Sequence, residues 1–191
     1  MSARALPDNF YERIKPHLHK RIGRELRLAK RVLDLGCGSC ELVRYLATAY
    51  CQKVTGVDIS GGSFPKKKST PKHIAFRCLQ QDAARLDFVA DWSMDAVVTV
   101  WALHEMGRPQ PIFEQARRVL RPGGEILVVD FPRDSLAQRL WNENYYQPDE
   151  VKRLLQDAGF EAVRARLIQQ GQVIWACGYQ SPLPGDHQPD R

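Results

Sequence analysis

The sequence lacks both a long apolar run and a secretory signal. No stretch of its 191 residues approaches the roughly 20 consecutive apolar residues that a membrane-spanning helix needs. Residues 1–6 also lack the apolar core of a signal peptide. These two absences predict a soluble, cytoplasmic protein whose five cysteines remain thiols, as expected in a reducing compartment.

Acidic residues are fewer than basic ones, and the resulting net charge of +6 comes entirely from the N-terminal segment. Residues 1–31 hold nine Lys and Arg against three acidic residues, whereas residues 32–191 hold 19 of each sign. A basic helical segment is more often a solvated face than a nucleic-acid site. The distribution therefore favours a small-molecule partner over a nucleic acid and leaves the oligomeric state open.

The basic segment has the pattern of an amphipathic helix. Asn9 followed by Glu12 predicts a capping box at its start. One apolar stripe then recurs every four residues, made of Phe10, Ile14, Leu18, Ile22 and Leu26. Because Pro16 lies inside this stripe, we expect a kink or two shorter helices. We interpret residues 1–30 as an N-terminal basic helical lid.

The rest of the chain alternates between strand and helix patterns. The expected strands cover residues 32–35, 53–58, 74–79, 95–101, 125–130, 162–169 and 173–179, and the expected helices cover residues 41–50, 112–120 and 149–158. The last two strands are separated by a few residues around Gly171, which is typical of an antiparallel hairpin. The order predicts a single α/β domain over residues 31–180, with a doubly wound, Rossmann-like, mostly parallel seven-stranded sheet and an antiparallel C-terminal hairpin. Residues 181–191 are expected to form a flexible tail.

A glycine loop after the first strand indicates a nucleoside site. Gly36 and Gly38 allow a tight turn whose backbone amides can face a ligand. Asp58 ends the second strand, where its carboxylate can accept from both hydroxyls of a ribose, and Asp82 follows the third strand as an acceptor for adenine. The dinucleotide fingerprint needs a further glycine where this chain has Glu41, so NAD is disfavoured and a cationic adenosine ligand is favoured.

The successive motifs resemble those of class I S-adenosylmethionine-dependent methyltransferases. They are VLDLGCG at residues 32–38, VDIS at 57–60, QDA at 81–83, DAVV at 95–98 and LRPGGE at 120–125. Within that superfamily, the chain is similar to the small-molecule group that includes the ubiquinone and menaquinone C-methyltransferases. The resemblance spans about residues 31–180.

This resemblance implies S-adenosylmethionine as the cofactor and assigns residues to it. Asp34, Gly36 and Gly38 would hold the methionine moiety with Cys37 beside them, Asp58 and Ile59 the ribose, Asp82 and Ala83 the adenine, and Trp101 would lie near the sulfonium. Two features depart from the family pattern: Cys40 replaces a glycine, and residues 61–68 replace the start of a helix. The adenine side of the site therefore departs most from the family pattern.

Catalysis should need few groups, because the methyl of a sulfonium is already activated. His104 and Glu105 follow the fourth strand as candidate proton acceptors, although a helix cap and a solvated charge explain them equally well. Aromatic residues from the N-terminal helix and from the insert after the fifth strand would enclose the substrate, namely Tyr11, Trp141, Tyr145 and Tyr146. Such a lid suits an apolar or planar acceptor.

Alternatives remain open. Cys37 and Cys40 form a C-x-x-C that could have a redox role, but no second cysteine pair completes a zinc site, so no metal is expected. An RNA methyltransferase could grip phosphates with the basic helix and residues 66–72. Against it, the chain lacks the Asn/Asp-Pro-Pro-aromatic and Pro-Cys elements of base methyltransferases after its fourth strand. A non-catalytic S-adenosylmethionine-binding subunit is the third possibility.

Overall fold

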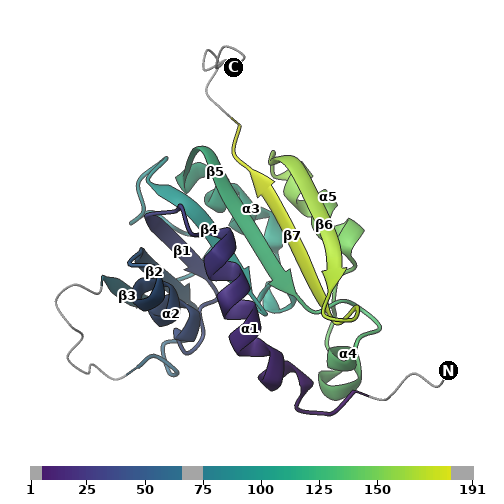
Figure 1. The fold of residues 1–191 in the computed structure, drawn as a ribbon. Coiled ribbons are helices and arrows are strands. Elements are labelled where there is room, and N and C mark those ends of the chain that lie inside the picture. Colours follow the sequence, from purple (N-terminus) through teal and green to yellow (C-terminus); the bar gives the residue numbers. More distant parts are fainter. Residues whose placement is uncertain (1–5, 66–74, 182–191) are drawn as a thin grey trace, which may run out of the picture.

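The structure is a computed structural model that describes residues 6–65 and 75–181 as one sheet with helices on both faces (Figure 1). The strands are β1 (Arg31–Leu35), β2 (Lys53–Asp58), β3 (Phe76–Gln80), β4 (Met94–Val100), β5 (Leu120–Asp130), β6 (Glu161–Ile168) and β7 (Val173–Tyr179). The α-helices are α1 (Phe10–Glu25), α2 (Glu41–Ala49), α3 (Pro109–Val119), α4 (Leu136–Trp141) and α5 (Pro148–Asp157), and η1 (Leu103–Glu105) is a 3-10 turn.

The sheet has the predicted seven strands and the predicted antiparallel C-terminal hairpin. Its order is β3-β2-β1-β4-β5-β7-β6, in which β1 to β5 pair in parallel and β7 lies antiparallel between β5 and β6. The strand order changes direction between β1 and β4, so the carboxyl ends of these two strands flank a topological switch point. In open α/β sheets, ligands bind in the crevice outside this edge. The predicted fold class is confirmed.

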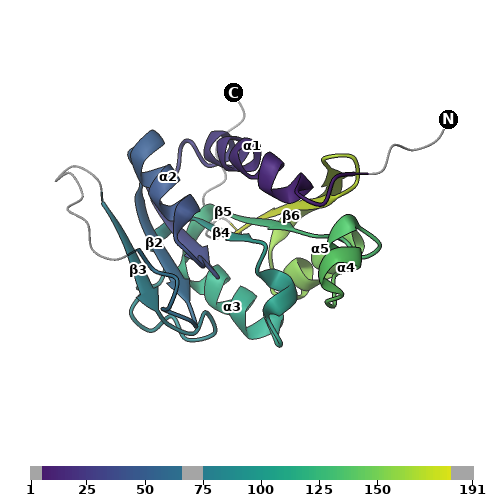
Figure 2. The ribbon, with the colours of Figure 1, turned by 90° about the horizontal axis from the view of Figure 1, so that it is seen from below.

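Helices cover the two faces of the sheet as separate layers. Seen from below, α1 and α2 lie on one face, and α3 and α5 lie on the other (Figure 2). Each layer has its own apolar cluster: Leu18, Ile22 and Val43 belong to the first, whereas Phe113 and Leu155 belong to the second. Because both faces are covered, β1 from Val32 and β5 from Ile126 are continuously buried, which explains why these stretches read as apolar runs rather than as alternating patterns.

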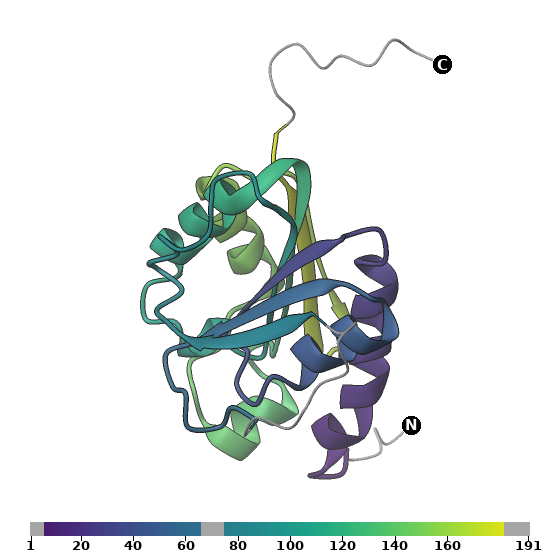
Figure 3. The ribbon, with the colours of Figure 1, turned by 90° about the vertical axis from the view of Figure 1, so that its left-hand side faces the viewer.

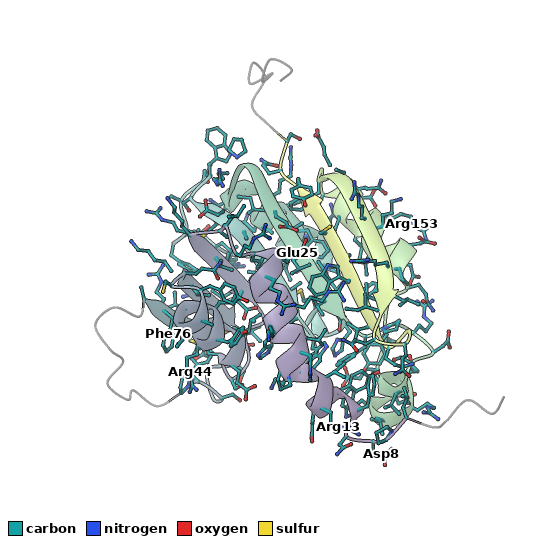
Figure 4. All side chains as sticks on the ribbon, viewed as in Figure 1. Asp8, Arg13, Glu25, Arg44, Phe76 and Arg153 are labelled. Atoms are coloured by element: carbon teal, nitrogen blue, oxygen red, sulfur yellow. A yellow bond between two sulfur atoms is a disulfide. The ribbon has the colours of Figure 1, made fainter. Side chains whose placement is uncertain are left out.

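The N-terminal helix crosses one face of the sheet and differs from its prediction in two ways. Figure 4 shows Asp8 and Arg13 at one end of α1 and Glu25 at the other. The side chain of Asn9 makes no capping hydrogen bond, so the predicted capping box is wrong. The helix also continues through Pro16 for 16 residues, so the division into two shorter helices is wrong, whereas the alternative of a kink stays a prediction. Burial of its apolar stripe outweighs the one backbone bond that a proline removes.

Other boundaries were predicted only in part. The sequence indicated an aromatic insert after the fifth strand but not the short helix α4 within it. β5 begins at Leu120, before the predicted start, because Gly123 and Gly124 continue the ladder through backbone hydrogen bonds with Gln180 (2.9 and 2.8 Å). Pro109 opens α3, earlier than predicted, at the first-turn position that proline favours.

The edge strand β3 borders the residues that the structure leaves undescribed. Figure 3 looks onto this edge, with α1 on one side of the sheet and α3 on the other. No helix occurs in residues 59–65, as the departure from the family pattern suggested. Ile74, Lys66 to Lys68 and the predicted tail from residue 182 lie outside the described residues. Across residues 6–65 and 75–181, no helix has the length and apolar character needed to cross a membrane.

Candidate active site

The glycine loop follows β1 directly at the switch point. The amides of Gly36 and Cys37 both donate to the carbonyl of Val57 at the end of β2 (2.9 and 3.0 Å), which folds the loop over that strand. Gly36 has φ +73°, and a Cβ there would lie 2.4 Å from the Cβ of Ala102. Gly38 has φ +48° and nothing within 4 Å of its Cβ position. The first glycine is therefore required by packing, whereas the second leaves open space for a ligand.

Asp58 is fixed beside that open space. Its Oδ2 accepts from the amide of Gly38 (2.8 Å), and its Oδ1 accepts from the amide of Ser60 (2.9 Å). Each carboxylate oxygen still has a lone pair to spare, since an ionised carboxylate accepts about four hydrogen bonds. The side chain is thus held in place by the backbone and can also accept from two neighbouring hydroxyls of a ribose.

Asp34 is a buried carboxylate that lacks a complete set of partners. Only 2% of its surface is exposed, and its Oδ1 has no hydrogen-bond partner among the described residues. Burial, with a smaller contribution from the charge of Asp58, raises the pKa of Asp34 to about 7. A buried acceptor without a partner is costly, and a cationic donor would relieve that cost. The position suits an amino group.

The predicted adenine side is more open. Asp82 accepts from the amide of Ala84 through Oδ1 (2.8 Å), and the adjacent amide of Gln81 donates to the carbonyl of Asp58 (2.9 Å). These bonds place the end of β3 beside the end of β2. Ile59 is 76% exposed, and Ala83 is half-buried. The arrangement leaves an apolar side chain and a carboxylate available at the same edge, and their adenine role remains a prediction.

The cysteines do not all behave as predicted. Cys40 and Cys78 form a disulfide, so the expectation that all five cysteines are thiols is wrong for this pair. Pairing of β2 with β3 places Cys78 next to the loop. The two cysteines are 38 residues apart in the sequence, so their proximity could not be predicted from spacing. Cys37, Cys51 and Cys177 are free. Burial, followed by the charges of Asp34 and Asp58, raises the pKa of the Cys37 thiol.

His104 lies at the carboxyl end of β4 with both ring nitrogens facing carboxylates. Its Nδ1 is 2.8 Å from Oδ1 of Asp130, and its backbone amide donates to Oδ2 of the same residue (2.9 Å). Because a carboxylate only accepts, Nδ1 carries the donated proton. Its Nε2 lies 3.3 Å from Oε2 of Glu143 and 4.0 Å from Oε1 of Glu105. The ring is therefore oriented by Asp130, with Nε2 turned toward Glu143.

The protonation of His104 reflects two opposed effects. Burial of the ring disfavours its charged form, but the hydrogen bond and charge of Asp130, with the charges of Glu105 and Glu143, outweigh burial and raise its pKa. The ligand atoms of His104, Glu105 and Glu143 lie within 4.8 Å of one another, so this group could also hold a cation. Both glutamates are exposed, however, so the structure does not hold them in place for a metal ion as firmly as it holds the buried hydrogen bond between His104 and Asp130.

Sequence reasoning missed Asp130 and Glu143. Asp130 is 1% exposed and ends the buried run of β5, where it also accepts from the amide of Phe131 (2.8 Å). A lone carboxylate at the carboxyl end of an apolar strand, one strand away from His104, was the signal that could have identified it. Glu143 gave no comparable signal, because it lies in an exposed loop after α4.

Aromatic rings from four segments meet next to His104. Trp101 stacks on Phe131 with ring centroids 5.2 Å apart, and Tyr11 packs edge-on against Phe131 at 4.6 Å. Trp141 contacts Tyr11 at 5.5 Å, and Tyr145 contacts His104 at 4.8 Å. We call Tyr11, Trp101, Phe131, Trp141 and Tyr145 the ring cluster. It includes three of the four predicted substrate residues and adds Phe131.

Polar atoms in the ring cluster divide into partnered and unpartnered ones. The hydroxyl oxygen of Tyr11 accepts from the amide of Ala137 (2.9 Å), so the first turn of α1 is joined to α4. The hydroxyl of Tyr145 and Nε1 of Trp101 are buried without partners within the part of the chain that the structure describes. Tyr146, the fourth predicted residue, instead packs against the second core cluster. The sequence alone could not separate these adjacent tyrosines.

A cavity among the described residues lies away from the ring cluster. A cavity of about 450 Å³ opens at the amino ends of β1, β2 and β3, lined by residues that include Arg31, Lys53, Phe76 and Phe88. That edge is opposite the switch point and contains none of the groups described above. We therefore place the site by its polar groups rather than by the size of an opening, because ligands of open α/β sheets bind outside the carboxyl ends of the strands.

Comparisons with known proteins agree with this geometry. A methyltransferase domain family matches residues 33–128, about half of the chain. The chain belongs to that methyltransferase family. A ubiquinone/menaquinone biosynthesis C-methyltransferase of Syntrophotalea carbinolica is 28% identical over 85% of this chain and 82% of its own length. A 27-O-demethylrifamycin SV methyltransferase of Amycolatopsis mediterranei is 36% identical over 56% of this chain and 40% of its own length.

Among solved structures, one putative methyltransferase of Haloferax volcanii, determined in complex with the Trm112 methyltransferase activator, has a TM-score of 0.70. It is 16% identical, and the match covers 96% of each chain, which shows a shared fold. Several of the curated relatives are longer proteins, of which this methyltransferase covers about half the length.

Family membership implies S-adenosylmethionine as the cofactor, and the residues present fit it. The partnerless oxygen of Asp34 suits the amino group of the methionine moiety, and the open space at Gly38 suits a close approach to the backbone. The spare acceptor capacity of Asp58 suits the ribose. A phosphorylated cofactor would instead meet two carboxylates, which oppose it electrostatically.

Proposed function

We propose that this protein transfers a methyl group from S-adenosylmethionine to a small apolar or aromatic molecule. The observation that carries the proposal is the position of His104 and the ring cluster at the carboxyl end of β4, next to the switch point that Asp34 and Asp58 flank. A cofactor held by those carboxylates would present its sulfonium toward β4. An acceptor would then lie between the rings.

In this scheme each residue has a simple task. S-adenosylmethionine supplies a methyl that is already activated as part of a sulfonium. Asp34 accepts from the amino group, Asp58 accepts from the ribose, and Asp82 with Ala83 and Ile59 borders the adenine. Trp101 packs beside the reacting centre, and its stacking on Phe131 fixes the ring. Positioning an acceptor in line with the sulfonium supplies most of the rate enhancement.

His104 is the proposed base where the acceptor must lose a proton. Nδ1 is held by Asp130, so Nε2 faces the site and can accept that proton when the ring is neutral. Asp130 then stabilises the resulting imidazolium, as a buried carboxylate does for a catalytic histidine. Glu105 lies 4.0 Å from Nε2 and is exposed, so we assign it to the electrostatic environment of His104 rather than to direct proton transfer.

The proposed organisation follows from the same contacts. Residues 1–30 act as a lid because Tyr11 joins α1 to α4 across the ring cluster, and residues 31–180 form the cofactor-binding domain. Trp141 is 48% exposed and is the member of the cluster that an incoming acceptor reaches first. Tyr11, Trp141 and Tyr145 are the proposed acceptor contacts. We propose a cytoplasmic location, where the cofactor is made.

Release of S-adenosylhomocysteine tests the proposed function. The purified protein is first titrated with S-adenosylmethionine by calorimetry and then assayed against a panel of quinols, phenols, indoles and small amines. We expect cofactor binding and turnover of at least one apolar or aromatic acceptor, reduced by Trp141→Ala without loss of cofactor affinity. Binding without turnover of any acceptor would favour the non-catalytic subunit, and absence of binding would refute the site.

A further inference from the structure

Three cysteine sulfurs meet behind the cofactor loop. The sulfur atoms of Cys37, Cys40 and Cys78 lie within 4.8 Å of one another. Sγ of Cys37 is 3.5 Å from Sγ of Cys40, and Cys40 is joined to Cys78 as a disulfide. Cys37 and Cys40 are 9% and 0% exposed, and Cys78 is half-buried. Nothing in the proposed methyl transfer uses these sulfurs.

Local structure explains why the sulfurs converge. Gly56 of β2 lies in register with Cys78 of β3, and a Cβ at Gly56 would lie only 2.7 Å from Sγ of Cys37. A glycine at this position therefore creates the space that the Cys37 sulfur occupies. Cys40 adopts φ +60° at the N-cap of α2, a left-handed conformation that bends the chain back toward Cys37. The loop thus forms a C-x-x-C knuckle facing a third cysteine.

We propose that, in the reduced protein, Cys37, Cys40 and Cys78 bind one soft divalent metal ion of the Zn²⁺ type. Zinc–thiolate bonds of about 2.3 Å place tetrahedral sulfurs about 3.8 Å apart, and C-x-x-C is the usual spacing for two such ligands. The Cys37–Cys40 separation of 3.5 Å already matches that distance, and release of the disulfide lets Cys78 take the third position. One coordination position remains for a small ligand.

The electrostatic surroundings also favour a cation. The amide of Gly38, next to Cys37 in the loop, donates to Asp58, which places that carboxylate on the cofactor side of the loop. Three thiolates packed together beside it without a counter-ion would be strongly disfavoured. A divalent ion would compensate that charge. It would also tie the loop that carries Gly38, and hence Asp58, to β3. The ion would therefore brace the cofactor site, although its binding does not depend on any methyl transfer.

Metal binding requires reduction of the disulfide first. A phosphine reductant gives two electrons to the Cys40–Cys78 bond and takes the oxygen atom of a water molecule to become its oxide, and the two protons of that water complete the two thiols. The ion then displaces the thiol protons as the metal–sulfur bonds form. A phosphine leaves no competing thiol in solution, so the three protein sulfurs are the strongest ligands present.

Titration of the reduced full-length protein with Co²⁺ under anaerobic conditions tests the site. We expect thiolate-to-cobalt charge-transfer absorption that saturates at one ion per chain and disappears when Zn²⁺ is added. Cys78→Ser should weaken binding about tenfold or more, whereas the matched control Cys51→Ser, which alters an exposed free cysteine, should leave it unchanged. No charge-transfer band, or the same band in Cys78→Ser, overturns the proposal.

Thiol labelling of the wild-type protein keeps the test decisive if a variant fails to fold. Alkylation with and without Zn²⁺, followed by peptide mapping, should show protection of Cys37, Cys40 and Cys78 but not of Cys51. If the reduced protein is labelled equally at these cysteines with and without Zn²⁺, the ion does not bind their thiols, and the metal site would be rejected. The cofactor titration is a separate measurement, so failure of the proposed function leaves this result standing.

Discussion

The two halves of the carboxyl edge are built differently. The cofactor half, which we define as Asp34, Gly38 and Asp58, consists of polar groups placed by single strands and the loops that follow them. The acceptor half, which we define as the ring cluster with His104 and Asp130, draws on α1, α4 and the ends of β4 and β5. One half is local in sequence and polar, and the other is dispersed and aromatic.

This difference has a physical consequence for each half. The cofactor half is shaped before any ligand arrives, because backbone amides fix Asp58 and leave Asp34 with a free acceptor. In the acceptor half, Tyr11, Phe131 and Tyr145 are buried against their neighbours, so an acceptor bound there as proposed would replace ring–ring contacts with contacts of its own. Such contacts are worth about 0.5–1.5 kcal/mol per aromatic pair beyond buried area. Cofactor binding should therefore be sensitive to single polar changes, and acceptor binding to the fit of several rings.

The largest effect is expected at Asp58. Asp58→Ala removes two charge-assisted hydrogen bonds to the ribose and should cost about 2–4 kcal/mol of cofactor binding. Calorimetry measures this loss, and Asp157→Ala on the exposed face of α5 is the matched control. Unchanged affinity in Asp58→Ala would break the assignment of the cofactor half.

The acceptor half is tested through His104. For an acceptor that must lose a proton, His104→Ala should lower kcat by ~10² or more while cofactor affinity stays nearly constant. A retained kcat would reduce His104 to a structural role and leave catalysis to positioning alone.

A change at Asp130 should alter the pH dependence of the rate, because Asp130 is the hydrogen-bond partner of His104. The rate needs neutral His104, so it should rise with pH through the raised pKa of that group. Asp130→Asn removes the partner that raises the pKa, and the rise in rate should shift to lower pH. Steady-state kinetics across the pH range measures this shift. A profile that stays in place would show that Asp130 does not act through His104.

Much of the cofactor half could be predicted from the sequence, because each element lies within one strand and its loop. Asp34, Gly36, Gly38 and Asp58 occur where a strand pattern ends, and the structure places all of them at the switch point. Their cofactor roles remain predictions. The sheet topology followed from the alternation of strands and helices and from the short Gly171 loop.

The acceptor half and the sulfur cluster could be predicted only in part. Asp130 lies 26 residues from His104, and their contact depends on the register of β4 with β5. Cys78 meets Cys40 through the register of β2 with β3. Tyr145 and Tyr146 are adjacent in sequence but join different core clusters. Composition does not fix strand register, so these contacts could not be derived beforehand.

A smaller effect is expected in the pH dependence of stability, through the buried carboxyl group of Asp34. Asp34 keeps its proton in the folded protein up to pH of about 7 but loses it near 3.8 when unfolded. Unfolding free energy should therefore fall as pH rises between these values, by about 2 kcal/mol from pH 5 to pH 8. Asp34→Asn should abolish this fall and also weaken cofactor binding. Denaturant unfolding at the two pH values measures it, and equal slopes in both proteins would contradict the assignment.

The smallest effect is expected at the join between α1 and α4. Tyr11→Phe leaves the amide of Ala137 without its acceptor and should cost about 1 kcal/mol of unfolding free energy. Tyr145→Phe is the matched control, because its hydroxyl has no partner among the described residues and its removal should cost nothing. If chemical denaturation shows the two variants to be equal in stability, the hydroxyl of Tyr11 does not hold the lid.

The direction of β7 decides how the protein can be attached to a surface. β7 carries the chain away from the switch point, and Gln180 is pinned to Gly123 and Gly124 at the opposite edge (Figure 1). α1, by contrast, begins with Tyr11 against Trp141. A biosensor chip or fusion partner coupled on the C-terminal side therefore leaves the carboxyl edge of the sheet facing solution. Coupling on the N-terminal side would bring the partner close to Trp141 and should slow the binding of a bulky acceptor at the proposed acceptor contacts.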